Sequence, residues 1–164
     1  MISEIESIGS DITKYESLMA RMPGFSMKGE ALKTYLLKML KFGRILIESD
    51  GERIFGLVGF YANDMKSKVA YVSSFVVSQD VEGKGLARSM YKCFLGLAQS
   101  AGMSIVALEV CRTNLRALAF YQKMGLQVVG PGRDDKHWLM RGRVNQAVAA
   151  PSGRIGHMSH YLDH

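Results

Sequence analysis

Two glycines and two basic side chains follow shortly after "AYVSSFVV", an apolar run that is typical of a strand. In the segment "EGKGLAR", Gly83 and Gly85 flank Lys84, and Arg88 comes four residues after that lysine. Glycine lets a backbone curl closely around a ligand. The first N–H groups of a helix lack partners within the helix and carry partial positive charge. The segment therefore predicts a phosphate or pyrophosphate site where the strand turns into a helix.

Known phosphate-binding loops differ in how well they fit this segment. A Walker A loop requires GxxxxGK[ST], but Ser78 stands at its first glycine position and Gly85 follows Lys84. A Rossmann fingerprint requires GxGxxG, but Arg88 stands at its third glycine position. Glu109 comes somewhat beyond the roughly 20-residue spacing of its ribose-binding acid. The hairpin-like sequence before the loop and the short chain after it also disfavour a dinucleotide-binding domain.

A second group of reactive side chains lies in "LEVCRTNLRALAFYQKMGL", Leu108–Leu126. Glu109 interrupts an apolar strand, and Tyr121 follows twelve residues later. Such a carboxylate could take a proton from an amine, and a phenol could give one to a leaving group. Burial would make the carboxylate a stronger base. Two structural alternatives stay open: Glu109 only pairs with Arg112 or caps a neighbour, and Tyr121 is a core aromatic beside Phe120.

Together, the two segments resemble the GCN5-related N-acetyltransferases. The family's loop pattern, [Q/R]-x-x-G-x-[G/A], is similar to Glu82–Ala87, with Glu82 in place of the usual glutamine or arginine. The family's second pattern, L-x-V-x-x-x-N-x-x-A-x-x-x-Y-x-x-x-G-[F/L], is similar to Leu108–Leu126. Its matching positions include Asn114, Ala117, Tyr121 and Gly125. The similarity runs from about residue 44 to about residue 129.

The resemblance implies an acyltransferase that moves an acetyl group from acetyl-CoA, its co-substrate, to a primary amine by direct attack in a ternary complex. It implies Glu109 as the base, as in the protein N-terminal acetyltransferases, and Tyr121 as the acid that faces the coenzyme sulfur. A backbone N–H near Val76 or Val77, where the family's central strand bulges, would stabilise the oxyanion. The implied coenzyme-binding residues are Phe75, Val76, Val77, Glu82, Gly83, Lys84, Gly85, Leu86, Ala87, Arg88 and Asn114.

Several roles stay open within this hypothesis. Asn114 would contact the pantetheine arm, orient the turn or cap the helix that follows. Asp64 and Glu82 are weaker candidates for the base because both sit in turn or loop sequence. A covalent route through Cys111 is disfavoured because we expect no neighbouring histidine to form its thiolate.

The acceptor and the turnover itself are less well determined by the sequence. A CoA-binding regulatory module without turnover is the alternative function, and the presence of both Glu109 and Tyr121 argues against it. The acceptor, a small-molecule or peptide amine, would meet the first helices and the late strands. Those segments supply Met22, Phe25, Tyr35, Arg133 and Trp138, together with two aspartates. A homodimer is compatible with the sequence.

The elements that must position these residues follow from periodicity and turn signals. We expect helices at 12–22 and 28–41, a hairpin around Asp50–Gly51, and a third strand at about 68–78. A helix at 86–101, a strand at 104–110, a helix capped at residue 113 or 114, and a closing pair of strands follow. This order predicts an α/β fold of the α+β type: a mixed, mostly antiparallel sheet with helices on both faces.

Length and composition limit the function classes. The 164 residues suit one domain, which we expect at 1–144, followed by a flexible tail at 145–164 that carries three of the four histidines. No apolar run approaches the roughly 20 residues that cross a bilayer, and no signal-peptide pattern is present, so we expect a cytoplasmic protein without membrane contact. The net charge is +6, but the basic residues are scattered, which argues against nucleic-acid binding.

Both cysteines, Cys93 and Cys111, lie in apolar patterns, and neither belongs to a CxxC pair. We therefore expect buried thiols, with neither a disulfide nor a metal site.

Overall fold

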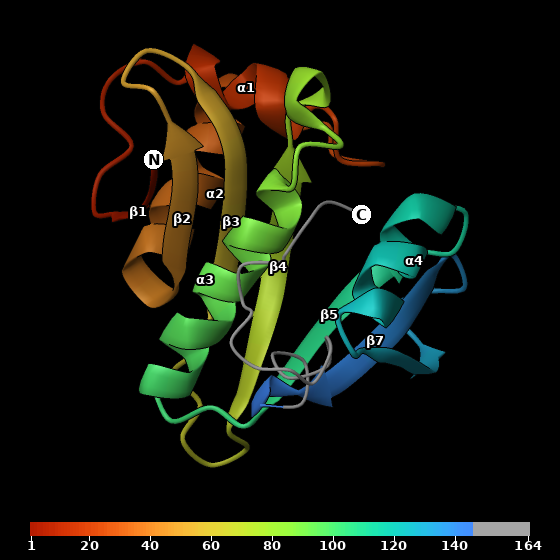
Figure 1. Cartoon of the computed structure of the whole chain (residues 1–164). Helices are drawn as coiled ribbons and strands as arrows, with labels where there is room; N and C mark the ends of the chain where they lie inside the picture. Colours follow the sequence, from red (N-terminus) through yellow and green to blue (C-terminus); the bar gives the residue numbers. More distant parts are fainter. Residues whose placement is uncertain (146–164) are drawn as a thin grey trace.

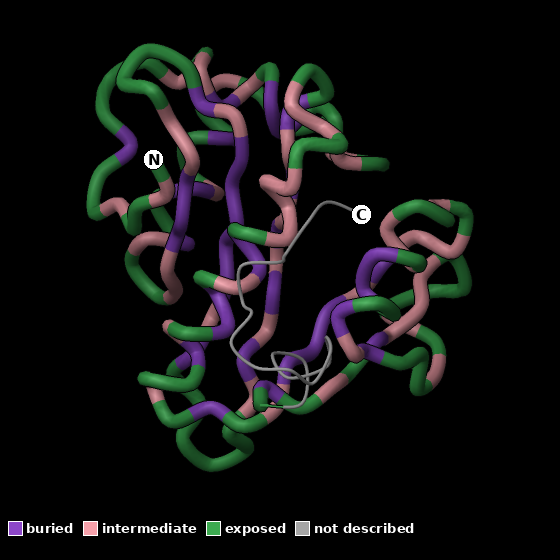
Figure 2. Tube along the Cα trace, viewed as in Figure 1, coloured by how far each residue is buried: buried purple, intermediate pink, exposed green. Residues whose placement is uncertain are grey.

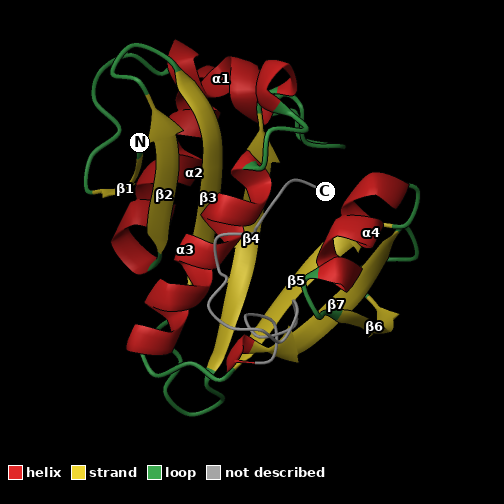
Figure 3. Cartoon of the chain, viewed as in Figure 1, coloured by secondary structure: helices red, strands yellow, loops and turns green. Residues whose placement is uncertain are grey.

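The computed structural model describes residues 1–145, which form one seven-stranded sheet in the order β1-β2-β3-β4-β5-β7-β6. All neighbouring strands pair antiparallel except β4 and β5, which are parallel. Figure 3 shows the sheet and the helices around it. The strands are β1 (Ile2–Ile5), β2 (Arg44–Ser49), β3 (Ile54–Tyr61), β4 (Val69–Val77), β5 (Ile105–Cys111), β6 (Gln127–Pro131) and β7 (His137–Arg143).

Helices cover both faces of this sheet, so the predicted fold class is confirmed. One core packs α1 and α2 against β2 and β3, and the other packs α3 and α4 against β3, β4 and β5. In Figure 2 the buried stretches run along the central strands and along the helix faces that meet them. The helices are α1 (Thr13–Met19), α2 (Gly29–Phe42), α3 (Leu86–Ser100) and α4 (Leu115–Lys123), with a short 3-10 turn, η1 (Gln79–Val81).

The central parallel pair separates part of the way along its length. β4 and β5 pair from Val69 opposite Ile105 to Val72 opposite Leu108. Beyond this point β4 continues beside β3 to Val77, while β5 continues beside β7 to Cys111. The two strands therefore diverge, as Figure 1 shows, and the sheet opens between them.

The first strand was absent from the sequence prediction. β1 pairs antiparallel with β2, and the Arg44 guanidinium donates two hydrogen bonds of 2.7 Å to the Glu4 carboxylate beside it. Its four residues are too few to show the alternation of a strand, and its two ends are only partly buried. Because β1 lies at the edge of the sheet, pairing with β2 rather than burial defines it.

The prediction of two buried thiols is wrong for Cys93, which is exposed. The buried face of α3 is formed by Met90, Tyr91, Phe94, Leu95 and Ala98, and Cys93 lies outside that stripe. Cys111 is partly buried in β5. The predicted tail at 145–164, with its histidines, lies outside the described residues from residue 146 onward. Within residues 1–145, no helix has both the length and the apolarity needed to cross a membrane.

Candidate active site

The glycine segment forms the predicted junction between a strand and a helix. β4 ends at Val77, η1 follows, and α3 begins at Leu86. Gly83 and Gly85 have φ angles of +80° and +83°, which side chains rarely allow. Gly85 is the N-cap of α3 and has no side chain that could accept a hydrogen bond from the first turn of this helix. The first N–H groups of a helix lack acceptors within the helix, so the start of α3 has the geometry of an anion site.

An ion pair fixes the start of this junction. The Arg53 guanidinium donates two hydrogen bonds of 2.6 Å to Asp80 and one of 2.7 Å to the Ser78 hydroxyl. The hydrogen bond from Arg53 is the largest cause that lowers the pKa of Asp80. Because Arg53 lies just before β3, the β2–β3 hairpin holds η1 in position ahead of the glycines.

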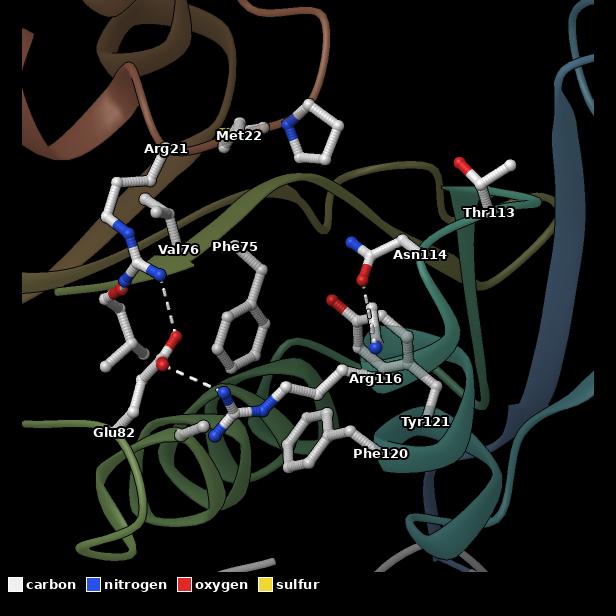
Figure 4. Close-up of a pocket in the computed structure, with 14 residues that line it drawn as sticks. Arg21, Met22, Phe75, Val76, Glu82, Thr113, Asn114, Arg116, Phe120 and Tyr121 are labelled. Carbon is white, nitrogen blue, oxygen red and sulfur yellow. Dashed lines mark hydrogen bonds and ion pairs between the residues drawn. The ribbon is translucent and has the colours of Figure 1, made fainter. Parts of the chain in front are cut away.

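A larger cavity of about 500 Å³ lies where β4 and β5 diverge, between the glycine segment and α4 (Figure 4). The predicted catalytic and coenzyme-binding residues among its lining are Phe75, Val76, Val77, Glu82, Ala87, Asn114 and Tyr121. The other predicted coenzyme contacts lie in the segment or the first turn of α3 and do not line this cavity: Gly83, Lys84, Gly85, Leu86 and Arg88.

Glu82 is held between two arginines that the sequence prediction missed. Its Oε2 accepts a hydrogen bond of 2.8 Å from Arg21, and its Oε1 accepts one of 2.8 Å from Arg116. Figure 4 shows the carboxylate between the two guanidinium groups at one side of the cavity. The hydrogen bond from Arg21 is the largest cause that lowers the pKa of Glu82. The signal in the sequence was the glutamate itself, which stands where the resembling family has glutamine or arginine.

Asn114 caps α4, as one of the predicted alternatives had it. Its Oδ1 accepts a hydrogen bond of 3.2 Å from the Ala117 N–H. The same side chain lines the cavity, so the cap places a polar group against any ligand in it. Asn114 can therefore cap the helix and contact a ligand in the cavity at the same time.

Tyr121 projects from α4 into an aromatic cluster. It is 8% exposed, and its ring lies 6.2 Å from that of Phe75 in an edge-to-face arrangement. Burial raises the pKa of the Tyr121 phenol far above its ordinary value. The phenol thus stays protonated at every physiological pH, which is the state that an acid must start from.

A smaller cavity of about 140 Å³ adjoins the larger one. The two share Met22, Pro23, Phe75, Asn114, Ala117 and Tyr121 as walls. Glu109, Arg133 and His137 line only the smaller cavity. Tyr121 therefore stands between the glycine segment on one side and the Glu109 carboxylate on the other.

Glu109 is held by the turn between β6 and β7 rather than by Arg112. Its Oε1 accepts hydrogen bonds of 3.1 Å from both the backbone N–H and the guanidinium of Arg133. Gly132 makes this approach possible, because a Cβ there would lie 2.9 Å from the Glu109 carboxyl carbon. The alternative in which Glu109 pairs with Arg112 is wrong, because that guanidinium stacks 3.7 Å from the centre of the Trp138 ring.

The other predicted bases have different partners. Asp64 closes the turn before β4: its carboxylate accepts hydrogen bonds from the N–H groups of Lys66 and Ser67. The hydrogen bond from the Ser67 hydroxyl is the largest cause that lowers the pKa of Asp64. Asp64 lines neither cavity, and Glu82 is occupied by its two arginines. Glu109 is therefore the carboxylate that faces the smaller cavity.

The sequence prediction placed no histidine near Cys111, and this is wrong. His137 in β7 lies opposite Cys111 in β5. The imidazole, however, is engaged at both nitrogens, with Asp134 at 2.7 Å from Nδ1 and Arg133 at 3.0 Å from Nε2. Sequence reasoning could not pair the cysteine with the histidine because a helix and a further strand separate them along the chain.

The irregularity in β4 lies at Ser73 rather than at Val76 or Val77. Gly59 pairs with Ser74 and Phe60 with Val72, which leaves Ser73 as the extra residue. The Tyr35 hydroxyl lies 3.0 Å from the Ser73 hydroxyl and 2.5 Å from that of Ser74. Both serines line the smaller cavity, and Tyr35 supports them from α2. Of the expected acceptor-pocket residues, Met22 and Arg133 line the smaller cavity, while Phe25, Tyr35 and Trp138 do not.

Comparison with known proteins identifies similar sequences. The model of the acetyltransferase (GNAT) family matches residues 15–126. A spermine/spermidine N(1)-acetyltransferase of Bacillus subtilis (strain 168) is 28% identical over 81 residues, which are 49% of this chain and 53% of that protein. The chain thus spans about half the length of the curated relatives that it matches.

Solved structures with the same fold have lower sequence identity. A ribosomal-protein alanine N-acetyltransferase from Escherichia coli has a TM-score of 0.69 at 16% identity, over 88% of this chain and 94% of that one. A GNAT family acetyltransferase from Elizabethkingia anophelis with acetyl-CoA bound has a TM-score of 0.66 at 14% identity, over 87% and 97% of the two chains. These likenesses show the fold.

Proposed function

The chain belongs to the acetyltransferase (GNAT) family, and from this premise we propose that it transfers an acetyl group from acetyl-CoA to a primary amine. The observation that carries the proposal is the position of Tyr121, which lines both the larger cavity beside the glycine segment and the smaller cavity beside Glu109. A thioester bound on one side and an amine bound on the other would meet at this phenol.

The larger cavity and the glycine segment beside it together fit the coenzyme. The N–H groups at the start of α3 and the positive φ angles of Gly83 and Gly85 provide a main-chain cradle for a pyrophosphate. Arg21 and Arg116 bring two guanidinium groups to the same side, and such groups bind phosphate with two parallel hydrogen bonds. Phe75 offers apolar surface for the pantetheine arm between the diverging strands.

The smaller cavity fits the acceptor. An alkyl amine has a pKa of about 10, so at neutral pH it must lose a proton before it can attack a thioester. Glu109 is the carboxylate that would accept this proton. Curated relatives include a spermine/spermidine acetyltransferase, and polyamines are accordingly our first choice among small amines; a peptide N-terminus is the second.

Two further groups complete the reaction. As the amine nitrogen bonds to the carbonyl carbon and the carbon–sulfur bond breaks, Tyr121 would give its proton to the departing sulfur. Pairing between β4 and β5 ends at Val72, so main-chain N–H groups from Ser73 to Val77 that point toward β5 face the opening. We assign the stabilisation of the carbonyl oxygen to one of these groups. The transfer is then direct, within a ternary complex.

The experiment that tests this function measures free thiol release from acetyl-CoA. The purified chain is incubated with spermidine, with a peptide that begins with alanine, and without an amine. We expect thiol release that depends on an amine, together with an acetylated product detected by mass spectrometry. Binding of acetyl-CoA without amine-dependent release by any primary amine would instead favour a CoA-binding module without turnover.

A further inference from the structure

The turn between β6 and β7 places a basic side chain between two hydrogen-bond acceptors. The Arg133 guanidinium donates to Glu109 Oε1 at 3.1 Å through one amino group and lies 3.0 Å from His137 Nε2 through the other. Glu109, Arg133 and His137 all line the smaller cavity. A positive charge therefore already occupies the part of this cavity that the acceptor amine has to reach.

The hydrogen bonds of His137 show which of its ring nitrogens carries the hydrogen and which one accepts from the Arg133 guanidinium. The Asp134 carboxylate, 2.7 Å from Nδ1, can only accept, so Nδ1 carries the hydrogen. Nε2 is then free to accept, and the Arg133 guanidinium, which can only donate, satisfies it. Glu109 and His137 thus present two acceptors side by side, a pattern that suits an ammonium group as well as a guanidinium.

The backbone N–H of Arg133 holds the Glu109 carboxylate in place, whereas the side chain of Arg133 is able to move away from it. The backbone N–H of Arg133 also donates to Glu109 Oε1, and Gly132 lets the chain approach that closely. This bond fixes the carboxylate whatever side chain residue 133 carries. The Arg133 side chain is 62% exposed, whereas that of Glu109 is 16% exposed. The guanidinium can accordingly leave for solvent while the carboxylate stays in place.

We propose that the Arg133 guanidinium occupies the ammonium site of the acceptor, and that the amine binds by displacing it from Glu109 and His137. This inference rests on the proposed function and names the acceptor chemistry of that same site: an alkylammonium ion, received by a carboxylate and a neutral imidazole. Arg133 is then a competitor tethered to the protein, which raises the amine concentration that half-saturates the enzyme. Asp134 acts as a positioning residue, because it fixes the hydrogen of His137.

The test compares Arg133→Met with Arg141→Met, with spermidine as the probe amine. The methionine would keep the backbone bond to Glu109 and most of the length of the side chain but remove its charge. Arg141 lies on β7 and is exposed, so its variant removes the same charge away from both cavities. Because an exposed ion pair is weak, the competition is modest. We expect Arg133→Met to lower the KM for spermidine by about threefold to fivefold, with the effect on KM rather than on kcat, and Arg141→Met to match the wild type.

A second measurement supplies the missing guanidinium group as a free molecule. N-methylguanidine should inhibit Arg133→Met by competition with spermidine, at concentrations that leave the wild type unaffected. An unchanged or increased KM in Arg133→Met, or equal inhibition of both proteins, overturns the proposal.

The inference can be separated from the proposed function by binding alone. If spermidine gives no thiol release, its binding is followed through the nitrogen resonances of the His137 ring in wild type and in Arg133→Met. Tighter binding to the variant supports the displacement even though the proposed reaction with this amine has failed. Equal binding to the two proteins, or binding to neither, contradicts it.

Discussion

The two adjoining cavities are built from different parts of the chain. The larger cavity is lined by the end of β4 and by Ala87 at the start of α3, with the glycine segment and two arginines beside them. The smaller cavity faces side chains from separate strands, with Glu109 in β5 and His137 in β7. A diphosphate common to many reactions can be bound by backbone N–H groups, whereas a particular amine has to be selected by side chains. The difference explains why the donor can be named from a short motif and the acceptor cannot.

The largest expected effect is on coenzyme binding at the glycine segment beside the larger cavity. Gly85→Glu introduces a side chain at φ +83° and a negative charge at the anion site. We expect acetyl-CoA affinity to fall by more than about 100-fold, measured by calorimetry. Gly96→Glu adds the same charge to the exposed face of α3, where a Cβ meets no atom within 4 Å, and should bind normally. Unchanged affinity of Gly85→Glu for acetyl-CoA would show that the glycine segment does not bind the coenzyme.

The next largest effect is on kcat and comes from Tyr121, which lines both cavities. Tyr121→Phe removes only the phenolic proton donor of a buried side chain. Acetyl-CoA affinity should stay the same, while kcat should fall on the order of 100-fold if proton transfer to sulfur limits the reaction. Single-turnover kinetics with saturating acetyl-CoA measure this directly. If Tyr121→Phe kept the full rate, Tyr121 would not be the acid and would only pack in the aromatic cluster.

A smaller, pH-dependent effect belongs to the smaller cavity. Glu109→Gln keeps an acceptor for the Arg133 N–H but removes the base. At neutral pH nearly all of an amine with a pKa of about 10 is protonated, so kcat/KM should fall by about tenfold or more. As the pH rises toward the pKa of the amine, the free amine becomes abundant and the deficit should shrink. A deficit of equal size at every pH would mean that Glu109 does not accept the proton.

The smallest effect is a gain at the larger cavity. Glu82→Gln removes a negative charge beside the anion site and frees Arg21 and Arg116 from their ion pairs. Both guanidinium groups could then turn to the coenzyme phosphates, so acetyl-CoA affinity should rise by about threefold. The KM for the amine should not change, because Glu82 does not line the smaller cavity. Weaker coenzyme binding in Glu82→Gln would show that the ion pairs instead hold the cavity in shape.

The sequence predicted most of the fold and only part of the site, for physical reasons. Periodicity and turn residues identify elements such as the hairpin at Asp50–Gly51 and the cap at Asn114, because these are local properties. The edge strand β1 was missed because pairing with a distant strand defines it. Arg21 and His137 were missed as site residues because Glu82 and Cys111, which they lie beside, are far away in the chain. Arg133 was expected in the acceptor pocket but not as a partner of Glu109, which lies 24 residues earlier.

The central claim is that the acetyl group passes directly from the larger cavity to the smaller one at Tyr121. Initial rates measured with both acetyl-CoA and the amine varied test it most directly. Direct transfer in a ternary complex predicts double-reciprocal lines that intersect, and no acetyl group on the protein after incubation with acetyl-CoA alone. Parallel lines, together with an acetyl group on Cys111 found by mass spectrometry, would contradict the claim and show that the protein itself carries the acetyl group between the two substrates.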